Sequence, residues 1–316
     1  MCEPEGIAGF VLTEPAPAKI NLALHVTGQR EDGYHLLDML VTFTAFGDRI
    51  AVSPAQADHF TLSGRFSQSL EGEGANNLVI KARDRLRELL LQRGASAPPV
   101  HLHLEKNLPI ASGVGGGSAD AAAALRALLN LWNGALPCHD LADHDLADLD
   151  LADLALGLGA DVPMCLVARP LIARGVGEAI ELRADLPAFP MVLVNPLLGV
   201  STPETFRRLA QKDNPRLKVP KAGTGKPCWL AAMQGMRNDL ETPAISLVPE
   251  IASVKRALAA TGAGLVRMSG SGATCFGIYN TTQAAQQAAG ALAKMQPNWF
   301  VVATTSLGAE ELDDAT

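Results

Sequence analysis

The chain has 316 residues, 48% hydrophobic and 19% charged, and its formal net charge is −7 at pH 7. This length is sufficient for two domains, and the composition is ordinary for a globular enzyme. The negative charge argues against binding nucleic acid or an anionic membrane through bulk electrostatics. No apolar run approaches the roughly 20 residues of a membrane span, and the N-terminal segment lacks the pattern of a secretory signal. We therefore expect a cytoplasmic enzyme without a nucleic-acid or membrane partner.

The first third of the chain is expected to begin with strands and turns. Residues 11–13 and 20–26 are extended candidates, separated by Pro15-Ala16-Pro17, which cannot lie inside a helix. Residues 30–35 contain Asp-Gly, a strong reversal signal. The apolar spacing of residues 77–92 predicts a helix, and the alternation of residues 100–104 predicts a strand.

Alanine-rich and aspartate-rich segments follow. Residues from about 118 to 132 are expected to form a helix. Asp-Leu-Ala-Asp then occurs at 140–143, 145–148 and 150–153. A period of five matches neither helix nor strand, so we expect a solvated connector rather than a buried face, and we favour this over a metal site. A short helix is expected to end at 157–160.

The last part of the chain alternates between regular segments and loops. We expect strands at 190–195 and 275–279, and a helix at 250–260. Residues 212–226 are rich in Lys, Pro and Gly and predict an exposed, mobile loop with solvated basic residues. Residues 268–273 form a second glycine-rich segment.

No pattern of metal ligands is apparent. The five cysteines never form C-x-x-C, which favours neither a zinc site nor a disulfide framework. His101 and His103 have the spacing of some metal-binding pairs, but without a third ligand we expect both to face solvent. We therefore predict no metal site formed by the protein alone.

Residues 113–118, Gly-Val-Gly-Gly-Gly-Ser, are the most informative segment. Glycines permit close approach of the backbone, so successive N–H groups can surround an anion. The start of the following helix adds unpaired N–H groups and the positive end of its dipole. The loop completes neither the Walker A nor the dinucleotide-binding pattern. We predict a phosphate cradle; the alternative is a sharp turn with close helix packing.

Three other segments accompany this loop in order: residues 15–22 (Pro-Ala-Pro-Ala-Lys-Ile-Asn-Leu), 159–163 (Gly-Ala-Asp-Val-Pro) and 269–272 (Ser-Gly-Ser-Gly). The set resembles the GHMP small-molecule kinase superfamily. Arg-Glu-Asp-Gly-Tyr-His at 30–35 and Gly-Gly-Gly-Ser-Ala-Asp at 115–120 resemble the members whose substrate carries a cytidine diphosphate group. The likeness extends over about residues 13–280.

The resemblance implies a two-domain fold of mixed α+β class. The N-terminal domain, residues 1–170, would be similar to ribosomal protein S5 and hold ATP. The C-terminal domain, residues 171–316, would be ferredoxin-like and complete the substrate cleft. The implied reaction transfers the γ-phosphoryl group of ATP, with Mg²⁺, to a hydroxyl of the cytidine-linked substrate in isoprenoid precursor synthesis. We expect a monomer or weak homodimer.

The resemblance also implies a catalytic pair, Lys19 and Asp161. An aspartate can accept the hydroxyl proton, and a lysine can offset charge developing on the attacking oxygen. The residues alone leave other interpretations open. Lys19 could be a surface residue at the start of a strand, and Asp161 a turn residue before a proline.

For ATP, the resemblance implies binding by nine residues: Asn77, Lys106, Pro109, Gly113, Val114, Gly115, Gly116, Gly117 and Ser118. Ser118 could instead cap the helix or help to bind Mg²⁺. Asn77 could be an N-cap, and Lys106 a solvated residue at a strand end. Val114 and Ala119 replace Leu and Ser of the commoner pattern, which puts a role for a side chain at 119 in doubt.

For the acceptor, the resemblance implies that Tyr34, His35 and Phe206 hold cytosine by stacking and hydrogen bonding. It implies further contacts from Asn21 and from the second glycine segment, Gly270, Ser271 and Gly272. From the sequence alone, Phe206 could be a core residue, Asn21 could make a structural bond, and 270–272 could be a plain turn. Asn238 and Asp239 are substrate-adjacent or caps.

Two other functions fit part of these observations. A GHMP kinase acting on a sugar, homoserine or mevalonate would need no aromatic group to hold a base, so Tyr34, His35 and Phe206 argue against it. A nucleotide-binding regulatory protein would not need both Lys19 and Asp161.

Overall fold

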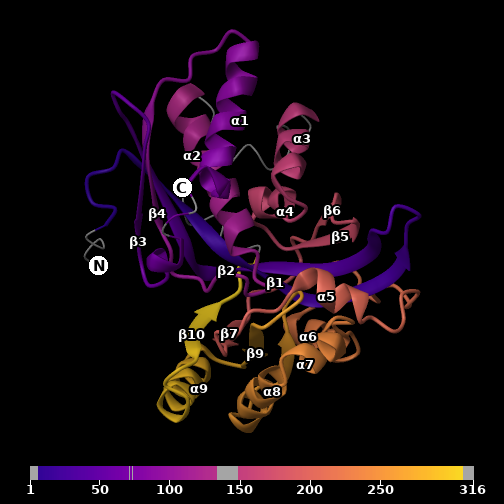
Figure 1. Ribbon diagram of the computed structural model, residues 1–316. Helices are drawn as coiled ribbons and strands as arrows, with labels where there is room; N and C mark the ends of the chain where they lie inside the picture. Colours follow the sequence, from indigo (N-terminus) through magenta and orange to yellow (C-terminus); the bar gives the residue numbers. More distant parts are fainter. Residues whose placement is uncertain (1–5, 71, 73, 134–148, 309–316) are drawn as a thin grey trace. The chain divides into compact units, whose positions relative to one another are not determined.

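A computed structural model describes residues 6–70, 72, 74–133 and 149–308 (Figure 1). Its contacts divide the chain into two compact units. Unit 1 comprises Met1–Ala18, Gly47–Ile110 and Gly115–Val167, and unit 2 comprises Lys19–Phe46, Ala111–Val114 and Ala168–Thr316. The predicted boundary at residue 170 divides the chain by sequence rather than by contacts, and it stays a prediction.

Two long paired strands, β1 (Leu12–Gln29) and β2 (His35–Pro54), contribute residues to both units. β1 is continuous through Pro15-Ala16-Pro17, so the expectation of two extended segments separated there is wrong. Among the described strands β1 pairs only with β2, and an edge strand tolerates proline because no ladder bond is lost on its free side. The predicted turn is confirmed: Arg30 N–H donates to Tyr34 O at 2.8 Å.

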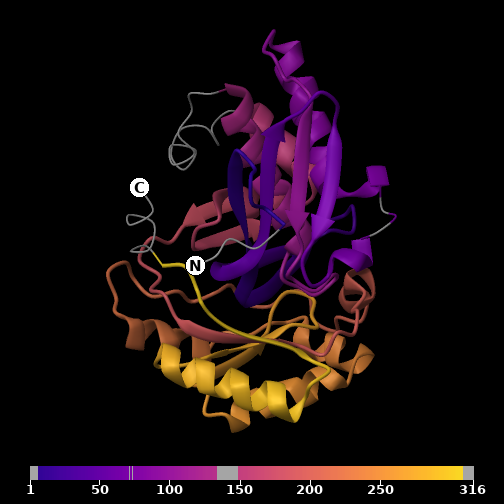
Figure 2. The same cartoon turned by 90° about the vertical axis from the view of Figure 1, so that its left-hand side faces the viewer.

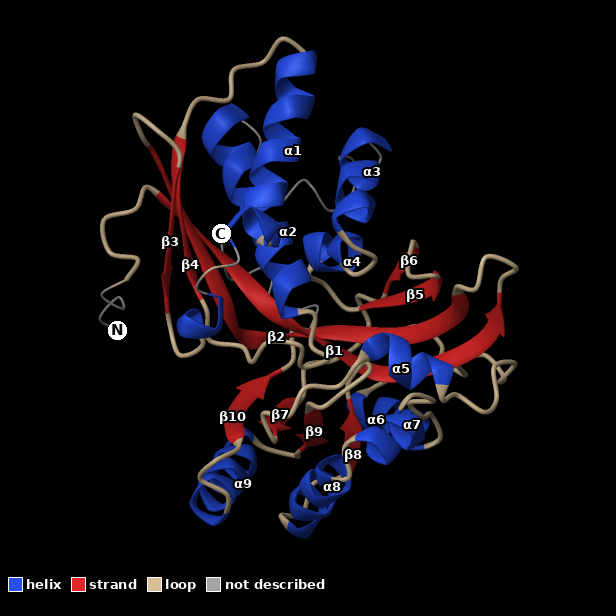
Figure 3. Ribbon diagram, viewed as in Figure 1, coloured by secondary structure: helices blue, strands red, loops and turns tan. Residues whose placement is uncertain are grey.

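In unit 1, the C-terminal half of β2 belongs to the part of a six-stranded sheet that lies beside the helices of this unit (Figure 3). β4 pairs in parallel with β3 and antiparallel with residues 49–54 of β2. The elements are β3 (His59–Ser63), η1 (Ser67–Leu70), η2 (Gly74–Asn76), α1 (Leu78–Gln92), β4 (Val100–Glu105), α2 (Gly116–Asn133), α3 (Leu149–Leu158) and α4 (Val162–Val167). The helices pack on one another, with α2 contacting α1 and α4.

The helices of unit 1 confirm most of the periodicity argument. Val79, Ala82, Leu86 and Leu90 of α1 are buried, as expected. α2 begins at Gly116, about two residues earlier than predicted, so the last glycines of the loop belong to its first turn. The expectation of a solvated connector is wrong for 150–153, which lie in α3 with Leu151 buried. Residues 139–148 lie outside the described residues.

In unit 2, residues 37–41 of β2 pair with β5 (Leu171–Gly175), which pairs with β6 (Ala179–Leu182). A second sheet has the strand order β10-β7-β9-β8, antiparallel throughout. Its strands are β7 (Pro190–Asn195), β8 (Leu265–Met268), β9 (Cys275–Ile278) and β10 (Phe300–Thr305).

Two helices, α8 (Glu250–Ala260) and α9 (Thr282–Met295), cover one face of this second sheet (Figure 2). With them the chain order is β7-α8-β8-β9-α9-β10, a βαββαβ arrangement. The expectation of a ferredoxin-like C-terminal region is therefore confirmed. β7 pairs on both sides, and all six of its residues are buried.

Three shorter helices of unit 2 lie between β7 and α8: α5 (Thr202–Arg207), α6 (Lys226–Gln234) and α7 (Glu241–Leu247). The loop before α6 is largely exposed, as expected, but it is tied to β1 and β2. Asn214 N–H donates to Val26 O at 2.9 Å, and Leu217 N–H donates to Asp38 Oδ2 at 3.0 Å. Lys212 Nζ donates to Gln29 Oε1 at 3.0 Å.

None of the helices in the described ranges is long and apolar enough to cross a membrane. Inside unit 1, the guanidinium of Arg126 fixes α2 to its neighbours. It donates to Cys165 O at 3.0 Å, to Pro15 O at 2.7 Å and to the Glu14 carboxylate at 3.3 Å. Arg126 is 8% exposed, and the Cys165 carbonyl that it pairs is buried, whereas Glu14 and Pro15 are nearer the surface.

We expect Arg126→Met to lower the free energy of unfolding by about 2–4 kcal/mol, because the buried carbonyl of Cys165 would remain unpaired and the Glu14 carboxylate and Pro15 carbonyl would lose their donor. Urea unfolding followed by circular dichroism measures this loss. Arg85→Met, at an exposed position of α1, is the matched control and should change stability by less than about 0.5 kcal/mol. Equal effects of the two substitutions would contradict the bracing role of Arg126.

Candidate active site

The residues predicted for the site fall into two groups, one in each unit. Unit 1 holds Asn77, Lys106, Pro109, Gly115, Gly116, Gly117, Ser118 and Asp161. Unit 2 holds Lys19, Asn21, Tyr34, His35, Gly113, Val114, Phe206, Gly270, Ser271 and Gly272. The predicted catalytic pair is therefore divided between the two groups.

In unit 2, the start of the glycine loop meets the turn between β8 and β9. Thr274 N–H donates to Ser112 O at 3.1 Å, and the Ser269 hydroxyl donates to Gly113 O at 3.1 Å. Gly113 has a φ of 75°, and a Cβ there would lie 2.6 Å from Ser269 O. The junction consequently requires glycine for both its conformation and its space.

Strand β1 brings two predicted residues to the same junction. Lys19 N–H donates to Val114 O at 2.9 Å, and Asn21 N–H donates to Ser269 Oγ at 3.0 Å. Lys19 lies inside β1 and is only 4% exposed, so the interpretation as a surface residue at a strand start is wrong.

Asn21 is fully buried, and its side chain makes no strong bond. Its amide nitrogen approaches the sulfur of Met39 at 3.3 Å, and thioether sulfur is a weak acceptor. Within the described part of the chain its Oδ1 has no hydrogen-bond partner. A buried amide oxygen without a donor is rare, so this atom is suited to receive a hydrogen bond from a ligand.

The second glycine segment is also held by Asn238, a residue that the sequence argument left uncommitted. Asn238 Nδ2 donates to Met268 O and to Gly270 O, both at 2.8 Å. The Ser271 hydroxyl lies 2.7 Å from Thr202 Oγ1. Residues 270–272 thus form a turn that leads into β9, and hydrogen bonds hold this turn in place. A turn was the alternative that the sequence left open for these residues.

In unit 1, the later part of the glycine loop opens α2. Ser118 lies in the first turn of the helix rather than before it, so the N-cap interpretation of Ser118 is wrong. Asn77 is the N-cap of α1, accepting from Val79 N–H at 2.9 Å, so its alternative is confirmed. Pro109 is buried, whereas Gly117 is exposed.

Lys106 is buried, which excludes the solvated alternative. Its Nζ lies 2.5 Å from Asp48 Oδ2 and 2.6 Å from Asp120 Oδ2. Burial lowers the pKa of Lys106, but the two carboxylates outweigh this and leave the pKa raised. Burial also raises the pKa of Asp120 well above its ordinary value, against the opposing effect of Lys106. The sequence argument did not single out Asp48 or Asp120, although Asp120 ends the Gly-Gly-Gly-Ser-Ala-Asp motif.

Asp161 lies in the turn between α3 and α4. Its carbonyl accepts from Cys165 N–H at 3.0 Å, the first bond of α4, so Asp161 occupies the N-cap position. The half-buried residue is a turn residue before a proline, as the plainer interpretation proposed.

His35 and Phe206 contact each other within unit 2. Their ring centroids lie 4.8 Å apart and their planes are inclined by 25°. Phe206 is half-buried at the end of α5, so the core interpretation is wrong. A base between two rings needs about 7 Å between their planes, twice the ordinary contact distance. The base would therefore lie beside this pair, not between its members.

The imidazole of His35 is prepared for a hydrogen bond. Its Nε2 is buried without a partner among the described residues. Burial, and after it the charge of Lys212, lowers the pKa of His35, so the ring is neutral at pH 7. The neighbouring Tyr34 is 64% exposed and offers a second, open aromatic face.

Two other features carry no predicted site residue. The expectation that His103 faces solvent is wrong. This residue is 5% exposed, and its ring nitrogens lie 2.8 Å from Thr61 Oγ1 and from Ser63 Oγ.

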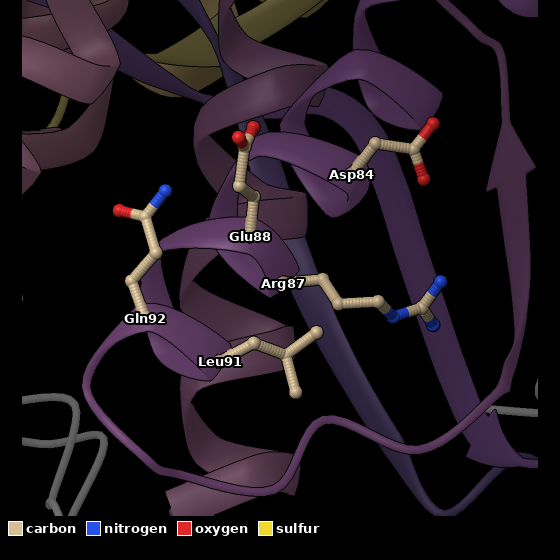
Figure 4. Close-up of a pocket in the computed structure, with 5 residues that line it drawn as sticks. All are labelled: Asp84, Arg87, Glu88, Leu91 and Gln92. Atoms are coloured by element: carbon tan, nitrogen blue, oxygen red, sulfur yellow. The ribbon is translucent and has the colours of Figure 1, made fainter.

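A hollow of about 470 Å³ on α1 is lined by Asp84, Arg87, Glu88, Leu91 and Gln92 (Figure 4).

Comparisons with known proteins identify the family of this chain. Family models for the GHMP kinases N terminal domain and the GHMP kinases C terminal match residues 77–169 and 226–298. A protein of Rhizobium etli named 4-diphosphocytidyl-2-C-methyl-D-erythritol kinase is 61% identical over 298 residues, covering 94% of this chain and 96% of its own length. The chain belongs to the 4-diphosphocytidyl-2-C-methyl-D-erythritol kinase family.

Further members of this family also match over nearly their whole length. A relative of that name from Sinorhizobium medicae is 57% identical over 308 residues, which is 96% of this chain and 98% of the relative. A crystal structure of 4-(cytidine 5'-diphospho)-2C-methyl-D-erythritol kinase matches with a TM-score of 0.75 and 34% identity, covering 94% of this chain and 100% of its own. The two-domain GHMP kinase fold expected from the sequence is thereby confirmed.

The wider superfamily shares the fold alone. A homoserine kinase from Cytophaga hutchinsonii has a TM-score of 0.62 at 18% identity, with 98% of each chain covered.

We expect Gly113→Ala to lower the free energy of unfolding by about 2–4 kcal/mol, from positive-φ strain and from the clash with Ser269 O. Thermal and urea unfolding measure the change. Gly199→Ala is the control, since no atom lies within 4 Å of a Cβ there. A loss at Gly113 no larger than that at Gly199 would show that the junction tolerates a side chain.

Proposed function

We propose that the chain catalyses ATP-dependent phosphorylation of the 2-hydroxyl of 4-diphosphocytidyl-2-C-methyl-D-erythritol, giving the 2-phosphate and ADP. The observation that carries the proposal is the His35–Phe206 pair with its buried, unpartnered Nε2, in a chain 61% identical to a named kinase of this substrate. A sugar, homoserine or mevalonate has no base for such a pair. We further propose a cytoplasmic monomer or weak homodimer acting in isoprenoid precursor synthesis.

Phosphoryl transfer to an alcohol depends mainly on positioning and charge stabilisation. In our proposal, Asp161 accepts the proton of the 2-hydroxyl as its oxygen attacks the γ-phosphorus. Lys19 stabilises the negative charge that develops on that oxygen. Asn21 orients the hydroxyl through its unpartnered Oδ1.

The glycine loop holds the phosphates of ATP in this proposal. Residues 113–118 supply backbone N–H groups, and α2 adds the N–H groups of its first turn. Asn77 and Lys106 are assigned to the adenine side in this proposal, and Pro109 also contributes to ATP binding. Gly270, Ser271 and Gly272 contribute on the acceptor side.

The expected Mg²⁺ needs separate treatment. Among the described residues there is no group of three or more His, Cys, Asp or Glu side chains that could hold a metal ion. The protein groups present do not fit a resident site, and Mg²⁺ commonly binds largely through substrate phosphates and water. We propose that the ion arrives bound to ATP, and we assign no step of the mechanism to it.

The function is tested by coupled ADP release with two acceptors, the diphosphocytidyl compound and the same polyol phosphate without cytidine. We expect turnover with the cytidyl compound only. Asp161→Asn should lower kcat by about 10²–10⁴ because the proton acceptor is lost, with the KM for ATP nearly unchanged. Turnover on other alcohols alone would keep the superfamily and refute the substrate.

We expect Phe206→Ala to raise the KM for the cytidyl substrate about 5- to 150-fold, the equivalent of about 1–3 kcal/mol for one base stack. Steady-state kinetics at saturating ATP measures the change. Phe10→Ala is a matched control, because Phe10 makes a similar ring contact with His101, at 4.8 Å in unit 1. An unchanged KM in the Phe206 variant would remove Phe206 from the cytosine site.

A further inference from the structure

A buried cluster of three charged side chains lies at the start of α2 in unit 1. Asp48 comes from β2, Lys106 follows β4, and Asp120 belongs to α2. They are 1%, 2% and 3% exposed. A Cβ placed on Gly116, the first residue of α2, would lie 3.1 Å from the ammonium of Lys106. The cluster is therefore in direct contact with the helix start that we propose to hold phosphate.

The charges of this cluster do not balance if all three groups are ionised. One ammonium faces two carboxylates, which leaves a net charge of −1 out of contact with water. Burying an uncompensated charge is costly, and the group usually neutralises instead. A single bound proton would make the cluster neutral.

The hydrogen bonds identify the carboxyl that takes this proton. Asp48 receives three donors: Lys106 Nζ, the N–H of Asn107 at 2.6 Å and the N–H of Leu108 at 2.7 Å. Asp120 Oδ2 accepts one hydrogen bond, from Lys106 Nζ, while the buried Oδ1 of Asp120 has no partner in the described part of the chain. Donors stabilise the ionised form of a carboxyl, so Asp48 is the anion and Asp120 the acid.

Electrostatics agrees with this assignment. Burial raises the pKa of Asp120 well above its ordinary value, the Lys106 ammonium opposes the rise, and the charge of Asp48 adds to it. A neutral Asp120 also removes a negative charge from the first turns of a helix whose N-terminus would face a polyphosphate.

We propose that Asp120 is held as a neutral acid, and that Asp48 and Lys106 act as positioning residues that fix the start of α2 for the phosphates of ATP. Asp48 binds the N–H groups of residues 107 and 108 to β2, and the ammonium of Lys106 lies close to Gly116. The role toward ATP rests on the proposed function, whereas the protonation of Asp120 does not.

The first test is the pH dependence of stability, measured by urea unfolding of the wild type and of Asp120→Asn between pH 4.5 and 8. In the unfolded chain Asp120 loses its proton near the ordinary value of 3.8, whereas the folded chain retains it to higher pH. The folded state therefore binds more protons in this window, and the wild type loses stability as the pH rises. Asp120→Asn cannot show this loss.

Below the folded pKa, the unfolding equilibrium constant of the wild type should accordingly rise about tenfold per pH unit relative to that of Asp120→Asn. Parallel curves for the two proteins would overturn the proposal, because an ionised Asp120 predicts no such divergence. This result is independent of any enzymatic activity. Failure of the proposed function would therefore be seen separately from failure of the proton assignment.

The second test compares Asp120→Asn with Asp48→Asn in the ADP-release assay. Asp120→Asn replaces a neutral group with a neutral group, and we expect kcat/KM for ATP to stay within about threefold of the wild type. Asp48→Asn removes the anion, and we expect the KM for ATP to rise at least about tenfold with a smaller change in kcat. Asp84→Asn, at an exposed aspartate of α1, is the matched control.

Equal losses in Asp120→Asn and Asp48→Asn would overturn the asymmetry on which the proposal depends. If Asp48→Asn does not fold, Lys106→Met provides the kinetic comparison, and the pH curves still decide the proton assignment. A KM for ATP unaffected in every variant of the cluster would remove its positioning role.

Discussion

The architecture of unit 2 depends on two glycines, Gly113 and Gly270, at the point where residues 112–114 meet the turn of residues 269–274. A Cβ on Gly113 would lie 2.6 Å from Ser269 O, and a Cβ on Gly270 would lie 2.6 Å from Gly113 O. The two backbones approach closely enough to share hydrogen bonds directly and through the Ser269 hydroxyl. Because β1 bonds to both segments, the positions of Lys19 and Asn21 follow from this contact.

The chemistry of the proposed site relies on burial as much as on charge. The protein has a net charge of −7, yet we assign it a polyphosphate ligand and a diphosphate-bearing substrate. Backbone N–H groups bind anions without adding a titratable cation, and a helix start contributes several of them. The cations that do take part, Lys19 and Lys106, are almost completely excluded from solvent. Their charge therefore acts with little screening.

Much of the secondary structure was predictable from local sequence rules. The helix over 77–92, its N-cap at Asn77 and the turn at 30–35 follow from periodicity and capping chemistry, and all three are present. Local rules failed where tertiary pairing decides the outcome. Prolines 15 and 17 interrupt no strand because β1 lies at an edge, and the repeat at 150–153 is helical because Leu151 packs inside unit 1.

The side chains of the site were harder to foresee for the same reason. The order of motifs pointed to Lys19, Asp161 and the glycine loop. The sequence does not show, however, whether a side chain at the end of a strand or in a loop is exposed or buried. Lys106 and His103 are buried because partners arrive from distant parts of the chain: Asp48 for Lys106, and Thr61 and Ser63 for His103. Spacing along one segment contains no information about such partners.

The division of the chain has a consequence for how the protein can be made and cut. Each unit is assembled from three separate stretches of sequence, and β1 and β2 pass from one unit to the other. No single cut between residues 19 and 167 leaves all residues of either unit on one fragment. Because β1 and β2 each contribute residues to both units, we expect a fragment expressed from either half of the sequence to lack a closed hydrophobic core.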